Sequence, residues 1–110
     1  MRLPNADRAV VDTVKLRDYC LNMHHPRGRH KARVFLAALG LAAADAEYVR
    51  EALLRAASAE EAVLTETDEY GARYQLDFTL TRGKRAARVR SSWIVRRGED
   101  FPRMTSCYVL

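Results

Sequence analysis

The sequence predicts an α+β fold: two to three N-terminal helices packed on a four-stranded antiparallel β-meander. Three observations predict it. Apolar residues recur with a helical period up to about residue 60 and with a period of two beyond residue 61. Glycine and proline interrupt the pattern between these segments. The length of 110 residues suits one hydrophobic core, so we expect a single domain over 1–110.

Residues 10–22 predict a short extended start and then a helix, which Asp12 or Thr13 can cap. Its expected apolar side consists of Val14, Leu16, Tyr19, Cys20 and Leu21. Pro26 and Gly28 then break the helical pattern. The second helix is expected at 29–40, where Gly40 ends it. Its expected buried stripe is Val34, Phe35, Ala38 and Leu39.

The third helix is expected at 45–57, because Asp45 and Glu47 would lie in its first turn, where the helix dipole favours acids. Its expected inner face is Val49, Ala52, Leu53 and Ala56. Strands are expected at 61–67, 73–81, 87–97 and 103–110, with turns at 82–85 and 98–102. In the second strand, one face carries Tyr74, Leu76, Phe78 and Leu80, and the other Arg73, Gln75, Asp77 and Thr79. In the third, Val89, Ser91, Trp93 and Val95 share one face, and Arg88, Arg90, Ser92, Ile94 and Arg96 the other.

The net charge of +5 and the pI of about 9.6 favour an acidic partner, although a GC-rich genome would equally explain an excess of arginine. The start of the chain has no apolar stretch of the signal-peptide kind, and no apolar run approaches the length of a membrane span. We therefore expect a cytoplasmic protein that does not act at a membrane. Cys20 and Cys107 are expected to be buried, reduced thiols.

Charge is segregated along the chain. Residues 19–44 and 78–98 contain no acid, whereas 45–69 are rich in acids. The second acid-free segment carries Arg82, Lys84, Arg85, Arg88, Arg90, Arg96 and Arg97. If the two basic segments meet, they form a basic sheet face that attracts phosphate. The alternative is an ordinary solvated face of an antiparallel sheet.

A second cation cluster surrounds the start of the second helix and consists of Arg27, Arg29, His30, Lys31 and Arg33. A helix N-terminus is a natural anion site, because its N–H groups lack partners in the helix. His30 lies four residues before Val34, and Lys31 four before Phe35. We therefore expect both to head the buried stripe and to point toward the sheet. His30 is then a core-edge histidine or a group in a helix–sheet cleft, and His24 and His25 are expected at the surface.

These residue types suit RNA cleavage without a metal or another cofactor, in which a base, an acid and cations act on the phosphate. A metal site is disfavoured because no acid or cysteine accompanies the histidines. Neither a nucleophile elbow nor a Walker-type loop is present. The candidate catalytic residues are His30, Lys31, Arg33, Arg90, Ser91 or Ser92, Thr105 and Tyr108. The candidate nucleic-acid-binding residues are Arg27, Arg29, Arg88, Arg96, Arg97 and Trp93, although we favour a core position for Trp93.

Three motifs run through the chain: GxHKAxVF at 28–35, WIVxxGEDFPR at 93–103 and TxCYV at 105–109. With them the sequence resembles a bacterial family known as a domain of unknown function. The resemblance implies that the gene for this chain lies beside a gene for another small protein. Alternatively, it implies that the chain is the last domain of a larger toxin-like or phage-related protein. The layout of helices and then a four-stranded sheet also resembles the barnase–EndoU–colicin–RelE superfamily of small ribonucleases, an analogy of fold alone.

Three functions remain open at this point. The chain is an endoribonuclease toxin neutralised by a small acidic antitoxin-like partner, or a non-catalytic module that binds RNA, DNA or an acidic protein. The third possibility is an immunity-like protein that docks an acidic mate. The first predicts that His30→Ala or Arg90→Ala abolishes activity without unfolding the protein.

Overall fold

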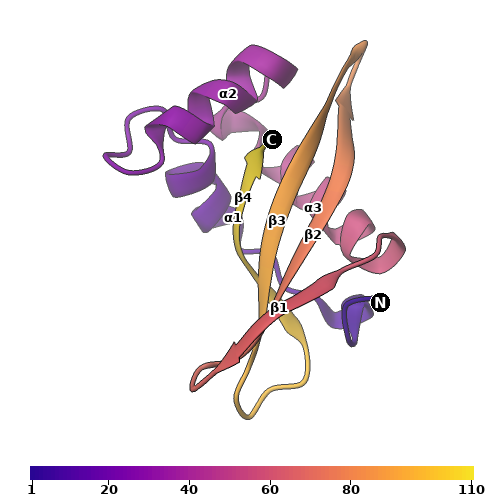
Figure 1. The fold of residues 1–110 in the computed structure, drawn as a ribbon. Helices are drawn as coiled ribbons and strands as arrows, with labels where there is room; N and C mark the ends of the chain where they lie inside the picture. The colour runs from indigo at the N-terminus through magenta and orange to yellow at the C-terminus, as the bar shows by residue number, and fades with distance from the viewer.

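A computed structural model describes residues 1–110 and shows the helices first and the sheet second (Figure 1). The helices are α1 (Thr13–Lys15), which continues as a π-helical segment at Leu16–Cys20, α2 (Arg29–Leu39) and α3 (Ala46–Ala59). Single 3₁₀ turns occur at Ala6–Arg8 and Ala43–Asp45. The strands are β1 (Val63–Asp68), β2 (Gly71–Arg82), β3 (Arg85–Arg96) and β4 (Pro102–Val109). The predicted α+β fold is therefore confirmed.

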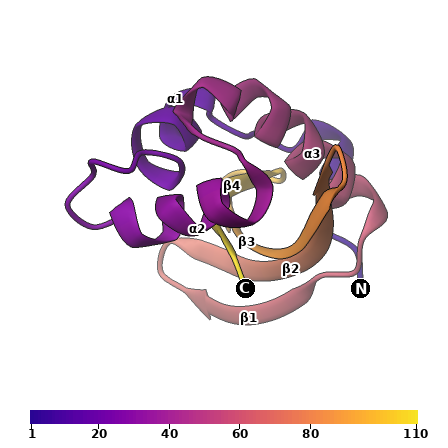
Figure 2. The same cartoon turned by 90° about the horizontal axis from the view of Figure 1, so that it is seen from above.

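The four strands form one antiparallel meander in the order β1-β2-β3-β4. β2 and β3 pair along their whole length, from Gly71 opposite Arg96 to Arg82 opposite Arg85. All three helices cover the same face of the curved sheet (Figure 2). Because successive side chains alternate between faces, every second residue of β2, β3 and β4 points away from the helices. We call this second side of the sheet the open face.

The helix-covered face carries the core, as the alternation in the sequence predicts. Leu76 and Phe78 on β2 and Val89 and Trp93 on β3 are buried against α2, α3 and the π-helical segment. Trp93 is only 1% exposed, and its indole N–H donates to the Ser91 hydroxyl at 2.9 Å. That hydroxyl donates in turn to the Leu76 carbonyl at 2.8 Å. The favoured core position of Trp93 is correct, and its alternative role as a base-stacking platform is wrong.

The buried stripe of α2 differs from the expected one. It consists of Ala32, Phe35 and Leu39, whereas Val34 is 44% exposed. The helix is turned because its start lies close to the π-helical segment: a Cβ added to Gly28 would come within 2.8 Å of the Tyr19 carbonyl oxygen. Ala32 lies one turn further along the same face, so small residues decide which face of α2 approaches its neighbour. The apolar pattern of the sequence alone did not predict this rotation of the helix.

The first helical stretch is confirmed, with one difference in its apolar side. The Asp12 carboxylate accepts from the Val14 N–H at 2.9 Å and so supplies the expected cap. The Val14 side chain, however, is exposed, because the buried side of this short stretch is formed by Leu16 and Cys20. Cys20 and Cys107 are both buried, as expected. No helix in the chain is both long and apolar enough to span a bilayer.

Candidate functional site

Three side chains form a row across the open face. Arg90 on β3 pairs with Asp77 on β2 and with Tyr108 on β4 in the strand register, so all three point to the same side. The Arg90 guanidinium donates to both Asp77 carboxylate oxygens, at 2.9 and 3.0 Å. A two-pronged contact of this kind fixes the plane as well as the position of the guanidinium.

Lys31 extends the row beyond the edge of the sheet. β4 is an edge strand, and its C-terminal end lies beside α2 (Figure 1). From α2, the Lys31 ammonium lies 4.4 Å from the centre of the Tyr108 ring, within the range of a cation–π contact. The fold therefore brings Lys31, Tyr108 and Arg90 together, three of the predicted catalytic residues, and adds Asp77 to them.

Within this row, Asp77 and Arg90 each stabilise the charged form of the other. The hydrogen bonds from Arg90 hold the pKa of Asp77 below its usual value. Asp77 first, and Tyr108 second, raise the pKa of Arg90 above its ordinary value. Asp77 is therefore a carboxylate at neutral pH and a weak base, suited to positioning Arg90. The Arg90 guanidinium stays charged in any solution where the protein is folded.

The row continues into a trough along the open face. Ser92, Gln75, Ser106 and Thr105 lie beside it and line a cavity of about 340 Å³. Thr105 also borders a cavity of about 460 Å³ at the far end of β3, where Arg96 and Arg97 lie. The fold thus places Ser92 and Thr105 between the row and the two terminal arginines. Ser91 is buried and engaged with Trp93, so Ser92 is the serine that faces the trough.

None of the remaining predicted cations forms an ion pair, although Arg88 and Arg96 lie near enough to Asp77 and Glu99, respectively, to lower the pKa of those carboxyls. Ten ion pairs occur in the structure, and none involves Arg27, Arg29, Arg33, Arg88, Arg96 or Arg97. Arg88 donates only to the Thr79 hydroxyl, at 3.2 Å, on the open face beside the Asp77–Arg90 pair. Arg29 donates to the Pro26 carbonyl at 2.9 Å. These unpaired charges are available to an anionic ligand.

The histidines differ from expectation. His30 and Lys31 are both exposed and do not head the buried stripe, because that stripe is turned toward Ala32. Lys31 flanks the stripe and still reaches Tyr108, whereas His30 lies on the solvent side of α2. His25 is half-buried, not a free surface residue: its Nδ1 accepts from the backbone N–H groups of Arg27 and Gly28, at 3.0 and 3.1 Å. His25 thus already occupies two of the backbone N–H groups before α2 that were expected to bind an anion.

Asp77 is the site residue that sequence reasoning missed. The sequence did single out this residue, because Asp77 is the only acid between Glu69 and Glu99. The period of two also places it on the polar face of the strand, opposite the face of Phe78. Its partner could not be named without the register of β2 and β3. No three His, Cys, Asp or Glu side chains come together as ligands of a metal ion would.

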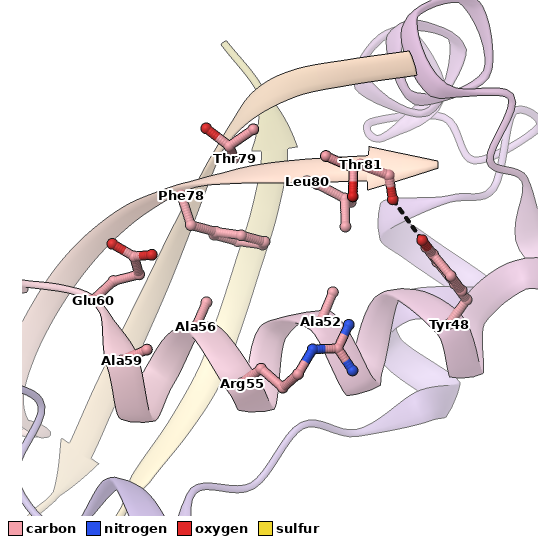
Figure 3. A pocket seen from close by; sticks show the side chains of 10 residues that line it. All are labelled: Tyr48, Ala52, Arg55, Ala56, Ala59, Glu60, Phe78, Thr79, Leu80 and Thr81. Carbon is pink, nitrogen blue, oxygen red and sulfur yellow. Dashed lines mark hydrogen bonds between the residues drawn. The ribbon is translucent and has the colours of Figure 1, made fainter. Parts of the chain in front are cut away.

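A further cavity of about 230 Å³ lies between α3 and β2, on a different side of the molecule (Figure 3). Ala52, Ala56 and Ala59 leave this space because their side chains are short. The Tyr48 hydroxyl donates to the Thr81 carbonyl at 2.5 Å and closes one end. This cavity contains none of the predicted site residues.

Comparisons with known proteins identify the family of this chain and a structure with the same fold. The family model described as "Domain of unknown function (DUF6883)" matches residues 2–110, which confirms the expected resemblance to a family of this kind. A chain of the "Contact-dependent growth inhibition toxin - immunity protein complex from Klebsiella pneumoniae 342" has the same fold, with a TM-score of 0.70 and 19% identity. The likeness covers 92% of this chain and 99% of that chain. No curated protein matches.

Proposed function

This chain belongs to the DUF6883 family, and we propose that it is a toxin-type endoribonuclease that works without a metal ion. The observation that carries the proposal is the row of Lys31, Tyr108, Arg90 and Asp77 on the open face. Unpaired arginines surround this row, as binding of a polyanion requires. The likeness in fold to a chain of a toxin–immunity complex supports a toxin or immunity-like role.

The proposed reaction is attack of an RNA 2′-oxygen on the neighbouring phosphorus with loss of the 5′-oxygen. Arg90, oriented by Asp77, and Lys31 would bind the phosphate oxygens, where negative charge grows in the transition state. The Tyr108 hydroxyl would give a proton to the leaving 5′-oxygen. Ser92 and Thr105 would bind the sugar–phosphate backbone in the trough.

His30 is the proposed base for the 2′-hydroxyl. It is adjacent to Lys31 in the first turn of α2 and is exposed, so RNA bound over Lys31 can reach its ring. Arg33, Arg27 and Arg29 would guide RNA to this position through their charge.

A protein partner is the second element of the proposal. The structural neighbour comes from a complex of a toxin with its immunity protein. The open face here carries Arg88 and Arg96, which form no ion pair and could contact an acidic protein. An acidic protein covering that face would block RNA and neutralise the toxin in the cytoplasm. If this chain is instead the immunity-like or purely binding component, the same face would dock the partner and no RNA would be cut.

Expression of the chain alone in a bacterial host separates these functions. We expect growth to stop while RNA breaks into discrete fragments, and Arg90→Ala to relieve both effects. Lys84→Ala is the matched control, because Lys84 is an exposed cation in the β2–β3 turn, outside the row. Normal growth with intact RNA, at an expression level equal to that of the variants, would reject the ribonuclease and favour the binding component.

Cleavage by the purified chain gives the direct test. We expect products that end in a 2′,3′-cyclic phosphate, with the same rate in a metal chelator as without it. A loss of activity in the chelator that added Mg²⁺ restores would reject the metal-independent mechanism. Products with a 3′-hydroxyl would also contradict attack by the 2′-oxygen.

A further inference from the structure

The cavity at the far end of the open face contains an exposed aromatic ring beside two free cations. It has a volume of about 460 Å³ and lies between the β1–β2 turn and the end of β3. Tyr70 is 63% exposed, although an aromatic side chain of this size usually covers apolar surface. Ile94, 6% exposed, lines the cavity together with Arg96, Arg97 and Glu69.

The Tyr70 turn is held firmly in place. The Asp68 carboxylate accepts from the backbone N–H groups of Tyr70 and Gly71, at 2.9 and 3.2 Å, and pairs with Arg73 at 2.7 Å. The Arg97 N–H donates to the Tyr70 carbonyl at 2.9 Å and so ties the turn to the end of β3. The backbone of the turn is therefore fixed beside the cavity that Tyr70 lines, while the Tyr70 side chain is exposed and free to contact a ligand.

The backbone at this turn admits only glycine. Gly71 has a φ of +146°, and a Cβ there would lie 2.1 Å from the Val95 carbonyl oxygen. The close approach of β2 to β3 at this point brings Tyr70 next to Arg96 and Arg97. The turn thus connects the two strands and also shapes the cavity.

The chemistry of these groups fits a nucleotide of single-stranded RNA. Arg96 and Arg97 have no acidic partner and suit phosphate oxygens, and the Tyr70 ring offers a face on which a base can stack. The Glu69 carboxylate is also unpaired and would repel phosphate, but it can accept a hydrogen bond from the amino group of a base. Cytosine, adenine and guanine carry such a group, and uracil does not.

We propose that Tyr70, Glu69, Arg96 and Arg97 form a subsite for one amino-bearing base of single-stranded RNA, separate from the row at Arg90. Arg90 and Arg96 lie six residues apart on the same face of β3, which is roughly 20 Å at the rise of a strand. The trough lined by Ser92 and Thr105 connects them, so the base read here lies a few nucleotides from the bond that is cut. The position of this base relative to the cut rests on the proposed function, whereas binding at the subsite does not.

Binding of short 2′-O-methyl oligonucleotides tests the subsite, because they have no free 2′-hydroxyl and cannot be cut by the proposed reaction. The probes are oligocytidine, oligouridine and an abasic strand of equal length, titrated against the complete chain by fluorescence anisotropy. We expect oligocytidine to bind about five- to a hundred-fold more tightly than the abasic strand. Tyr70→Ala should remove that difference, and Tyr70→Phe should keep it. Glu69→Ala, which removes the hydrogen-bond acceptor, should remove the preference for oligocytidine over oligouridine.

Equal affinity of the native chain for oligocytidine and the abasic strand would overturn the proposal, as would full base dependence in Tyr70→Ala. Equal binding of oligocytidine and oligouridine would overturn the choice of an amino-bearing base. Failure of the proposed function has a different result, since the chain would then leave natural RNA intact while Tyr70-dependent binding persists. Tyr70→Ala is a sound variant because the side chain is exposed and only its backbone forms hydrogen bonds.

Discussion

The start of α2 and the middle of β3 both carry cations of the candidate site, but the structure holds them differently. Arg90 on β3 is fixed by two hydrogen bonds to Asp77 and by its strand neighbours. His30 and Arg33 on α2 are exposed and form no side-chain hydrogen bond or ion pair. Among the basic residues at the start of α2, Lys31 is the one that contacts a side chain of the sheet. β3 therefore supplies side chains of fixed geometry, whereas α2 supplies side chains that only a bound substrate would bring into position.

The largest effect is expected at the proposed base. His30→Ala should lower the rate of RNA cleavage by about 10² to 10⁴, the usual contribution of general acid–base catalysis. His24→Ala is the matched control, because His24 is also an exposed histidine near α2 and lies outside the row. Cleavage rates of the purified variants measure the effect. Equal rates for the two variants would show that α2 contributes only charge.

Arg90→Ala should lower cleavage by about 10² to 10³, as loss of one fixed donor to a developing oxyanion does. Affinity for an uncleavable RNA analogue should change far less, because the surrounding arginines remain. Circular dichroism should show a folded protein, since Arg90 lies on the open face and not in the core. A variant that loses affinity and rate equally would show that Arg90 only binds substrate.

The α2 cations should act through their charge alone. Arg29→Ala and Arg33→Ala should each reduce the slope of log affinity against log salt by roughly 0.7, the value for one phosphate contact on a single strand. The cleavage rate at saturating RNA should be unchanged. Affinities measured at several salt concentrations test this, with Lys84→Ala as a control that leaves the slope unaltered. A drop in the saturated rate would place these arginines at the reacting phosphate.

The smallest effect concerns stability in acid. Arg90 lowers the pKa of Asp77 in the folded chain, so this pair stabilises the fold above the unfolded pKa of about 3.9. That contribution is lost as the pH falls through the lower, folded value. The midpoint of thermal unfolding should therefore fall in this acidic range, and by less in Asp77→Asn than in the native chain. Identical acid dependence in both proteins would show that the pair does not contribute to stability.

Periodicity predicted most of the fold because both periods are long and regular here. Tyr74, Leu76, Phe78 and Leu80 alternate without error along β2, and the structure buries all four. Period two also placed Arg88, Arg90 and Ser92 together on one face of β3. The error on α2 has a physical cause: Gly28 and Ala32 allow close helix packing, and such small residues carry little weight in an apolar pattern.

The element order, the segregation of charge and the family could all be inferred from the amino-acid sequence alone. Each depends on local residue types and on their spacing. The contacts of Asp77 with Arg90, of Lys31 with Tyr108 and of Tyr70 with Arg97 became visible in the folded structure. These contacts join residues far apart in the chain or across strands, so they depend on strand register and on the rotation of a helix. Both are set by how side chains pack together, which a single sequence does not display.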